Sequence, residues 1–246
     1  MSGGEATIAS PPSLFPMFRF LTPLASLALV STAGAAVVRI DFGGTANPTA
    51  VSGVTWNNLT GPAVGSNIAD LRDIGDVATG IRIEVTGAFR GVNSGGTTSS
   101  TLFPADATRD SFFGNTVSST NFPGTFPNGQ LTLSGLNPAE TYSILFYASR
   151  TGDSVNRESS YTATGGNGSQ SRTLNSNNTN GSVTVTGLTP DSNGRIVIDV
   201  GPGANNATTE KFYYLGAMEI TSVPEPGVSL LGAGALAFLL IRRRNG

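Results

Sequence analysis

The sequence of 246 residues carries 14 basic and 16 acidic side chains, a formal net charge of −2 at pH 7, and neither histidine nor cysteine. The missing residue types exclude a Ser-His-Asp triad, a Cys-His nucleophile, a zinc site built on imidazole or thiolate, and any disulfide. The slightly acidic balance argues against nucleic-acid binding, which requires a basic surface.

The N-terminal segment, residues 1–36, carries the pattern of a secretory signal peptide. Arg19 provides a basic start, an apolar stretch follows over Phe20–Val30, and small residues fill Thr32–Ala36. This order is typical of a leader that signal peptidase removes during export, and a buried N-terminal helix is the alternative. Because Met17 stands directly before the pattern, either the first residue or Met17 starts translation. The body that follows is expected to be exported.

Residues 37–222 alternate short apolar segments with Gly, Pro, Asn and Ser, which predicts an all-β body. Ile81–Val85 alternates apolar and charged residues, as expected of a strand with one buried face. Such strands suit a single β-sandwich of jelly-roll, galactose-binding-like type, with a fibronectin type III or immunoglobulin-like sandwich as the alternative. Ile68–Val77 comes nearest to a helical pattern, and Asn167–Asn180 is expected to be a mobile surface loop. The predicted strands are Val37–Phe42, Val54–Asn57, Gly80–Val85, Ser111–Phe113, Leu131–Leu133, Tyr142–Ala148, Ser160–Ala163, Val183–Val185, Arg195–Val200 and Lys211–Ile220.

A short motif occurs twice in the body. Leu131–Pro138 and Val183–Pro190 share a strand followed by Gly-Leu-x-Pro, and each leads into another strand. Glycine permits a sharp bend, leucine is expected to fill the core, and proline sets the direction of the exit. In the first copy, Tyr142 lies six residues after Leu136. This spacing resembles a tyrosine corner, in which the phenol hydroxyl bonds nearby backbone.

Without histidine and cysteine, carboxylates are the strong acid–base groups that remain. Asp106 with Asp110, and Asp153 with Glu158, are pairs that a carbohydrate hydrolase would need. The alternative is that these carboxylates cap turns, as aspartate commonly does. We therefore assign no catalytic residue from the sequence. The abundant oxygen ligands make a structural calcium ion the one cofactor to consider. Asp70 with Asp73 and Asp76 is a third candidate carboxylate set, and its spacing is not that of an EF-hand calcium loop.

Carbohydrate binding requires aromatic faces and polar groups on an exposed surface. Trp56 is the sole tryptophan and is followed by two asparagines, whereas Arg150, Asp153 and Arg157 share one polar segment. These four residues are the candidate ligand-binding set. Two alternatives compete with that role: Trp56 in the core, and Arg150 as a charge that protects a sheet edge.

The C-terminal segment, residues 223–246, has three parts in a fixed order: the motif Val223, Pro224, Glu225 and Pro226, the apolar run Val228–Ile241, and the cluster Arg242, Arg243 and Arg244. The apolar run is expected to insert as a transmembrane helix, with the arginines on the cytoplasmic side. This tail resembles the PEP-CTERM sorting signal of Gram-negative bacteria. The resemblance implies that an exosortase, a membrane protein thought to cleave near the motif, recognises Val223–Pro226. The protein would then leave the membrane for the cell surface or the extracellular polysaccharide matrix, and an uncleaved anchor is the alternative.

The body itself resembles the β-rich proteins that carry PEP-CTERM tails, in Phe146–Arg150 and in Asn156–Glu158 with Tyr161. Tyr214–Ile220 is similar to the closing strand of galactose-binding-like and malectin-like sandwiches. We therefore expect an exported, non-enzymatic protein that is structural or contacts polysaccharide. Exosortase and signal peptidase would be its partners during export. A carbohydrate-active hydrolase and a permanently anchored surface adhesin are the alternatives.

Overall fold

The computed structural model describes residues 1, 3, 35–152 and 154–224. Several predicted features lie outside the described residues: most of the signal peptide, Asp153, the motif residues Glu225 and Pro226, the apolar run Val228–Ile241, and the cluster Arg242–Arg244. Within the described part, no helix combines the length and the apolar character needed to cross a membrane.

Fourteen strands and two four-residue helices occur in the described residues, which confirms the predicted all-β class. The elements in chain order are β1 (Val37–Phe42), α1 (Thr49–Ser52), β2 (Asn57–Leu59), β3 (Asn67–Ile68), β4 (Arg82–Gly87), β5 (Gly91–Asn93), α2 (Ala105–Thr108), β6 (Ser111–Asn115), β7 (Gly129–Ser134), β8 (Glu140–Tyr147), β9 (Glu158–Gly165), β10 (Gly168–Asn175), β11 (Ser182–Leu188), β12 (Ile196–Pro202), β13 (Phe212–Leu215) and β14 (Ala217–Pro224).

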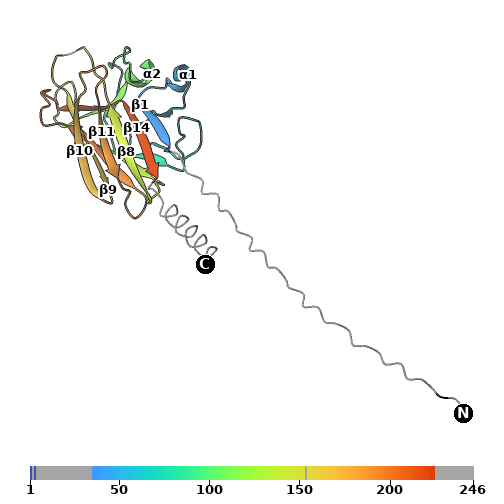
Figure 1. The fold of residues 1–246 in the computed structure, drawn as a ribbon. Helices are drawn as coiled ribbons and strands as arrows, with labels where there is room; N and C mark the ends of the chain where they lie inside the picture. The colour runs from blue at the N-terminus through green and yellow to red at the C-terminus, as the bar shows by residue number, and fades with distance from the viewer. Residues whose placement is uncertain (2, 4–34, 153, 225–246) are drawn as a thin grey trace, which may run out of the picture. The chain divides into compact units, whose positions relative to one another are not determined.

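These strands form three sheets (Figure 1). The order is β11-β8-β14-β1-β2 in a five-stranded sheet, β10-β9-β12-β7-β4-β3 in a six-stranded sheet, and β13-β6-β5 in a small third sheet. β1 and β2 pair in parallel, and the other paired strands are antiparallel. The two larger sheets share one hydrophobic cluster between them, which is the arrangement of a β-sandwich.

Alternation along the strands builds this common core. In β12, Ile196, Ile198 and Val200 have no exposed surface, whereas the residues between them are partly exposed. Phe146 of β8 and Tyr161 of β9 stack with 4.7 Å between ring centroids and 9° between ring planes. Because β8 and β9 belong to different sheets, this aromatic pair joins the two layers directly.

The repeated motif forms two corners that cross between the sheets in opposite directions. The first leads from β7 of the six-stranded sheet to β8 of the five-stranded sheet, and the second leads from β11 back to β12. Gly135 and Gly187 have φ angles of 77° and 68°, a conformation that costs glycine little. Leu136 and Leu188 are buried, as the motif predicts.

A tyrosine corner closes the first of these turns. The hydroxyl of Tyr142 accepts a hydrogen bond from the backbone N–H of Asn137 at 2.9 Å. Burial raises the pKa of Tyr142 to about 12, so the hydroxyl stays neutral under ordinary conditions. The structure thus confirms the corner that the spacing of Leu136 and Tyr142 predicts.

Several local predictions differ from the structure. Asn167–Asn180 is not a loop throughout, because β10 lies within it and pairs with β9 along eight residues. Lys211–Ile220 is not one strand, since the chain breaks at Gly216 into β13 and β14. Ile68–Val77 contains no helical turn and instead leads from β3 into a turn. The strand predicted at Val54–Asn57 is displaced, because β2 begins at Asn57 and continues to Leu59.

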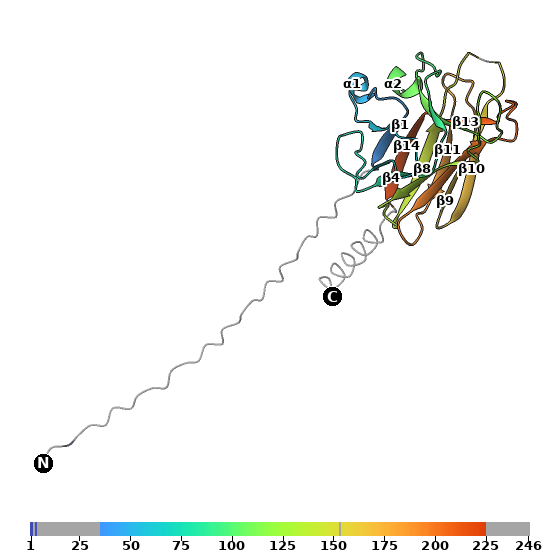
Figure 2. The same cartoon turned by 180° about the vertical axis from the view of Figure 1, so that it is seen from behind.

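The two ends of the sandwich differ (Figures 1 and 2). Val37 of β1 pairs with Thr221 of β14, and Pro224 pairs with Glu140 of β8, so the chain enters and leaves the sheet at one end. We call this the terminal end. The opposite end carries α1, α2 and the long connections around β5, β6 and β13, and we call it the loop end.

Candidate functional site

Trp56, a candidate sugar platform by sequence, is buried at the loop end. Its side chain is 3% exposed and meets the ring of Phe103 edge-on, with 5.2 Å between centroids and an angle of 88°. The guanidinium of Arg39 lies 5.7 Å from the Trp56 ring and pairs with Glu219 at 2.8 Å. Trp56 is therefore part of a small core on the outer side of the five-stranded sheet and offers no exposed face.

Arg150 and Arg157 meet at one loop and help to hold its shape. The backbone N–H of Arg150 donates to the carbonyl of Ser176 at 2.6 Å, and the Ser176 N–H donates to the carbonyl of Arg157 at 3.1 Å. Nη1 of Arg150 donates to the carbonyl of Thr151 at 2.9 Å. Arg157 is only 9% exposed, and Asp153 lies outside the described residues. The two arginines of the predicted set thus lie at one loop, where Arg150 contacts loop backbone through its guanidinium and Arg157 through its own backbone. The structure does not join Trp56 to them, because Trp56 packs against Phe103.

The carboxylates predicted as hydrolase pairs have local partners. Asp106 lies 3.3 Å from Arg109, and Asp110 is 5% exposed. Glu158 is 9% exposed and accepts hydrogen bonds from the backbone N–H of Asn205 at 2.9 Å and from its Nδ2 at 3.1 Å. These contacts match the alternative that the carboxylates stabilise loops.

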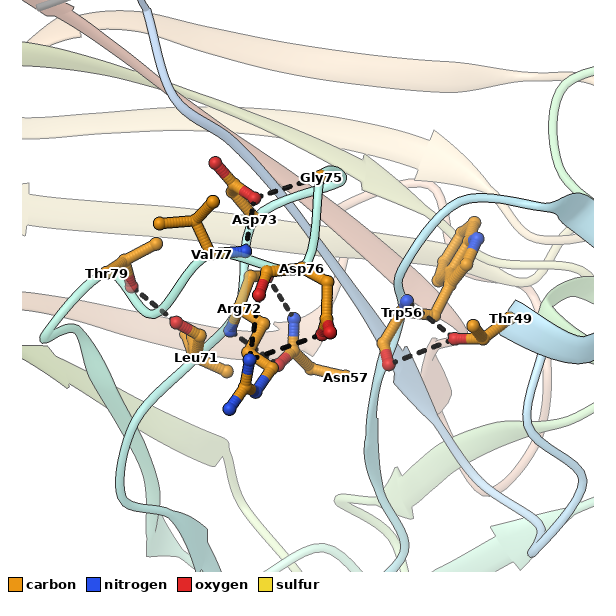
Figure 3. A network of polar contacts seen from close by, with 10 residues as sticks. All are labelled: Thr49, Trp56, Asn57, Leu71, Arg72, Asp73, Gly75, Asp76, Val77 and Thr79. Carbon is orange, nitrogen blue, oxygen red and sulfur yellow. Dashed lines mark hydrogen bonds and ion pairs between the residues drawn. The ribbon is translucent and has the colours of Figure 1, made fainter.

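The third acidic group shapes a turn between β3 and β4 (Figure 3). Oδ1 of Asp73 accepts hydrogen bonds from the backbone N–H groups of Gly75 and Val77, both at 2.9 Å. Nη1 of Arg72 donates to the carbonyl of Asp76 at 2.7 Å and lies 3.4 Å from its Oδ1. The carboxylate of Asp73 thus accepts backbone N–H groups that the sharp turn leaves without a backbone partner, whereas Asp76 pairs with the Arg72 side chain.

Asp41, at the end of β1, has no exposed surface. Burial, together with the negative charges of Asp110 and Asp106, raises the pKa of Asp41 to about 9. Burial also raises the pKa of Asp110, although its Oδ2 accepts a hydrogen bond from the N–H of Gly44 at 2.6 Å. Asn58 of β2 lies directly opposite Asp41 in the parallel pair. We call Asp41, Asn58 and Asp110 the buried acceptor cluster.

A second group at the loop end is not predicted by the sequence. The guanidinium of Arg90 lies 5.3 Å from the ring centroid of Phe122 and 5.8 Å from that of Phe126. Phe113 of β6 stacks on Tyr214 with 6.3 Å between centroids. We call the four partly exposed side chains of this group the aromatic rim: Arg90, Phe113, Phe122 and Phe126.

The loop that carries the rim is folded around Asn115. This side chain has no exposed surface and donates from Nδ2 to the carbonyls of Val117 at 2.9 Å and Gly124 at 3.0 Å. Its Oδ1 accepts a hydrogen bond from Nη1 of Arg90 at 3.1 Å. Asn115 therefore holds the loop backbone in place and also positions the guanidinium of Arg90. The available sequence signal was the presence of phenylalanines in a polar loop rich in Gly, Pro and Ser.

The outer face of the six-stranded sheet carries a polar hollow of about 370 Å³. Nη2 of Arg82 lies 2.7 Å from Oε2 of Glu84 in this hollow. The lining side chains are hydroxyl or charged groups and supply no ring for stacking, so the hollow is a weaker candidate than the aromatic rim. Its lining consists of Arg82, Glu84, Thr86, Thr132, Ser134 and Arg195.

No protein-family model and no curated protein matches the sequence. Among solved structures, the chain is similar to the ANXUR2 extracellular domain from Arabidopsis thaliana, with a TM-score of 0.44, 12% identity and coverage of 77% of this chain and 49% of that one. The ANXUR1 extracellular domain from the same plant gives a TM-score of 0.42 and 12% identity, over 75% of this chain and 47% of that one. The chain thus spans about half the length of these two domains. TmCBM61 in complex with beta-1,4-galactotriose gives a TM-score of 0.30 and 15% identity, over 58% of this chain and 88% of that one.

Proposed function

We propose that the chain is an exported, non-catalytic β-sandwich protein of jelly-roll, galactose-binding-like type that contacts polysaccharide through its aromatic rim. The observation that carries this proposal is the guanidinium of Arg90 beside two partly exposed phenylalanine rings. Aromatic faces stack on the apolar face of a sugar ring, and a guanidinium donates several directed hydrogen bonds to its oxygens. The two corners that cross between the sheets support a sandwich in which successive strands change sheet, as they do in a jelly roll.

The position of the rim suits a protein attached or processed at its C-terminus. The rim lies at the loop end, whereas the chain leaves the sandwich at Pro224 on the terminal end. Val223 is 47% exposed and pairs with Thr141 at the end of β14. Cleavage after Pro224 would therefore leave every strand of the body in place. We propose that export by the leader and recognition of the C-terminal motif by an exosortase bring the body to the cell surface or matrix.

The double replacement Phe122→Ala and Phe126→Ala is expected to weaken polysaccharide binding by about tenfold or more, because both stacking faces are lost. The measurement is a glycan array with the wild-type protein, followed by calorimetry on the polysaccharide that it retains best. Val64→Ala is a matched control, since Val64 is 63% exposed and stands in the connection between β2 and β3.

Three results would count against this proposal. The first is an equal loss of binding in the control and in the double variant, which would place the contact elsewhere. The second is release of sugar fragments by the wild-type protein that disappears in Glu158→Gln, which would make the protein a hydrolase. The third is an array without any bound glycan, which would argue against carbohydrate contact.

Glu225→Ala is expected to stop C-terminal processing in a host that has an exosortase, because the charged centre of the motif is removed. Mass spectrometry of the mature protein should show a C-terminus close to the motif for the wild type and an intact Arg242–Arg244 for the variant. Glu219→Ala is the matched control, since its carboxylate pairs with Arg39 within the sheet. An intact C-terminus in the wild-type protein would favour a permanent anchor.

A further inference from the structure

The buried acceptor cluster presents several oxygen atoms to which the protein supplies no donor. Both carboxylate oxygens of Asp41, Oδ1 of Asp110 and Oδ1 of Asn58 are buried and have no hydrogen-bond partner. A buried acceptor without a partner destabilises the folded state, and a charged one does so more strongly. Acceptors that gather without donors are the arrangement expected around a bound cation, which interacts favourably with all of them.

The three side chains are placed together by connected backbone. Asp41 and Asn58 lie opposite each other on adjacent strands, so their side chains extend from the same face of the sheet. Nδ2 of Asn58 donates to the carbonyl of Gly44 at 3.1 Å, and the N–H of Gly44 donates to Oδ2 of Asp110 at 2.6 Å. The loop after β1 thus connects Asn58 to Asp110. The remaining oxygens of both residues, and those of Asp41, stay without a donor.

The charge around the cluster is also unbalanced. Arg109 pairs with Asp106 at 3.3 Å, and none of the ion pairs in the described residues includes Asp41 or Asp110. Two carboxyl groups therefore stand without a basic partner. A divalent cation would balance this excess without moving any side chain from another part of the fold.

We infer that Asp41, Asn58 and Asp110 bind a calcium ion through two carboxylates and one amide oxygen. Calcium accepts carboxylate, amide and backbone oxygens in flexible geometry, whereas magnesium gives up its water reluctantly and suits a buried site poorly. No group of three or more acidic side chains is placed to hold a metal in the described residues, so the amide of Asn58 is an essential part of the inferred site. The ion would join β1, β2 and the segment after α2, and so stabilise the loop end.

Calcium added to the calcium-free full-length protein is expected to bind with a dissociation constant of about 0.1–1 mM, the range of extracellular modules. At a hundredfold excess over that constant, the melting temperature should rise by about 5 °C or more. Trp56 is the sole tryptophan and stands two residues before Asn58, so its fluorescence provides a second, local measurement. Calorimetry with calcium chloride gives the affinity directly.

Asp41→Asn and Asp110→Asn should each weaken calcium binding by about tenfold or more, because each removes one charged ligand. Asn58→Ala tests the amide oxygen without a change in charge. Asp191→Asn is the matched control, since Asp191 accepts the backbone N–H groups of Asn193 and Arg195 in an exposed turn. Unchanged affinity in the control with a loss in the three variants supports the site.

Three outcomes would overturn the inference. The wild-type protein could show neither heat nor a change in melting temperature at a hundredfold excess of calcium over about 1 mM. The control could lose as much affinity as the cluster variants, which would indicate diffuse binding to acidic surface. Asp41→Asn could leave calcium binding unchanged, which would mean that Asp41 is a neutral acid and not a ligand. If one variant fails to fold, Asn58→Ala and the remaining carboxylate variant still decide between these outcomes.

Discussion

Replacing Tyr161 by alanine is expected to lower the free energy of unfolding by about 4 kcal/mol, because a large cavity opens between the two sheets. Tyr161 has no exposed surface, and its ring stacks on Phe146 of the opposite sheet. Its hydroxyl also donates to the carbonyl of Tyr214 at 2.8 Å. Burial raises the pKa of the Tyr161 hydroxyl, so the hydroxyl keeps its proton and remains a donor at neutral pH.

Urea denaturation of the purified protein measures this loss. Tyr161→Phe is the matched control, because it keeps the stacked ring and removes only the hydroxyl. We expect it to cost about 1–2 kcal/mol, the value of one buried hydrogen bond with its partner left unpaired. If alanine and phenylalanine were equally destabilising, the stacking of Tyr161 on Phe146 would contribute nothing to the stability of the sandwich.

Replacing Asn115 by alanine is expected to lower the free energy of unfolding by about 3 kcal/mol, since three hydrogen bonds at about 1 kcal/mol each are lost. The partners are the carbonyls of Val117 and Gly124 and the guanidinium of Arg90. Because Arg90 stands beside the rings of Phe122 and Phe126, the rim should lose its shape as well.

Thermal unfolding and limited proteolysis of the loop between β6 and β7 measure these two effects separately. Asn121→Ala is the matched control, because Asn121 lies in the same loop and is exposed. The control should keep the wild-type melting temperature and cleavage rate. A variant at Asn115 that unfolds at a lower temperature but is cleaved no faster would show that Asn115 supports the fold without organising the loop.

Most strands were predictable because alternation between apolar and polar residues is a local property of the chain. β1 has the bounds that its sequence predicts, and β12 buries every second residue as expected. β10 was missed because it is an edge strand of Ser, Thr, Gln and Arg, which carries no apolar period. The break at Gly216 was missed because β13 and β14 are both rich in strand-forming residues, and only their different partner strands separate them.

The candidate sites were less predictable than the strands. The side chain of Arg90 meets the rings of Phe122 and Phe126 only because the loop between β6 and β7 folds back around Asn115. Trp56, by contrast, was a predicted site residue that the structure buries. Its exposure could not be decided from its neighbours in sequence, and Phe103, which covers it, comes from a distant segment.

Local chemistry therefore settles the class of fold, the two Gly-Leu-x-Pro corners and the tyrosine corner, since each depends on residues close together in the chain. Burial of a particular polar group is different. The alternation in β1 places Asp41 on the outer face of the sheet, where a carboxylate would normally meet water. It is buried because other segments of the chain cover that face. The unpartnered oxygens of Asp41, Asn58 and Asp110, and the calcium site inferred from them, come from long-range packing that no local pattern encodes.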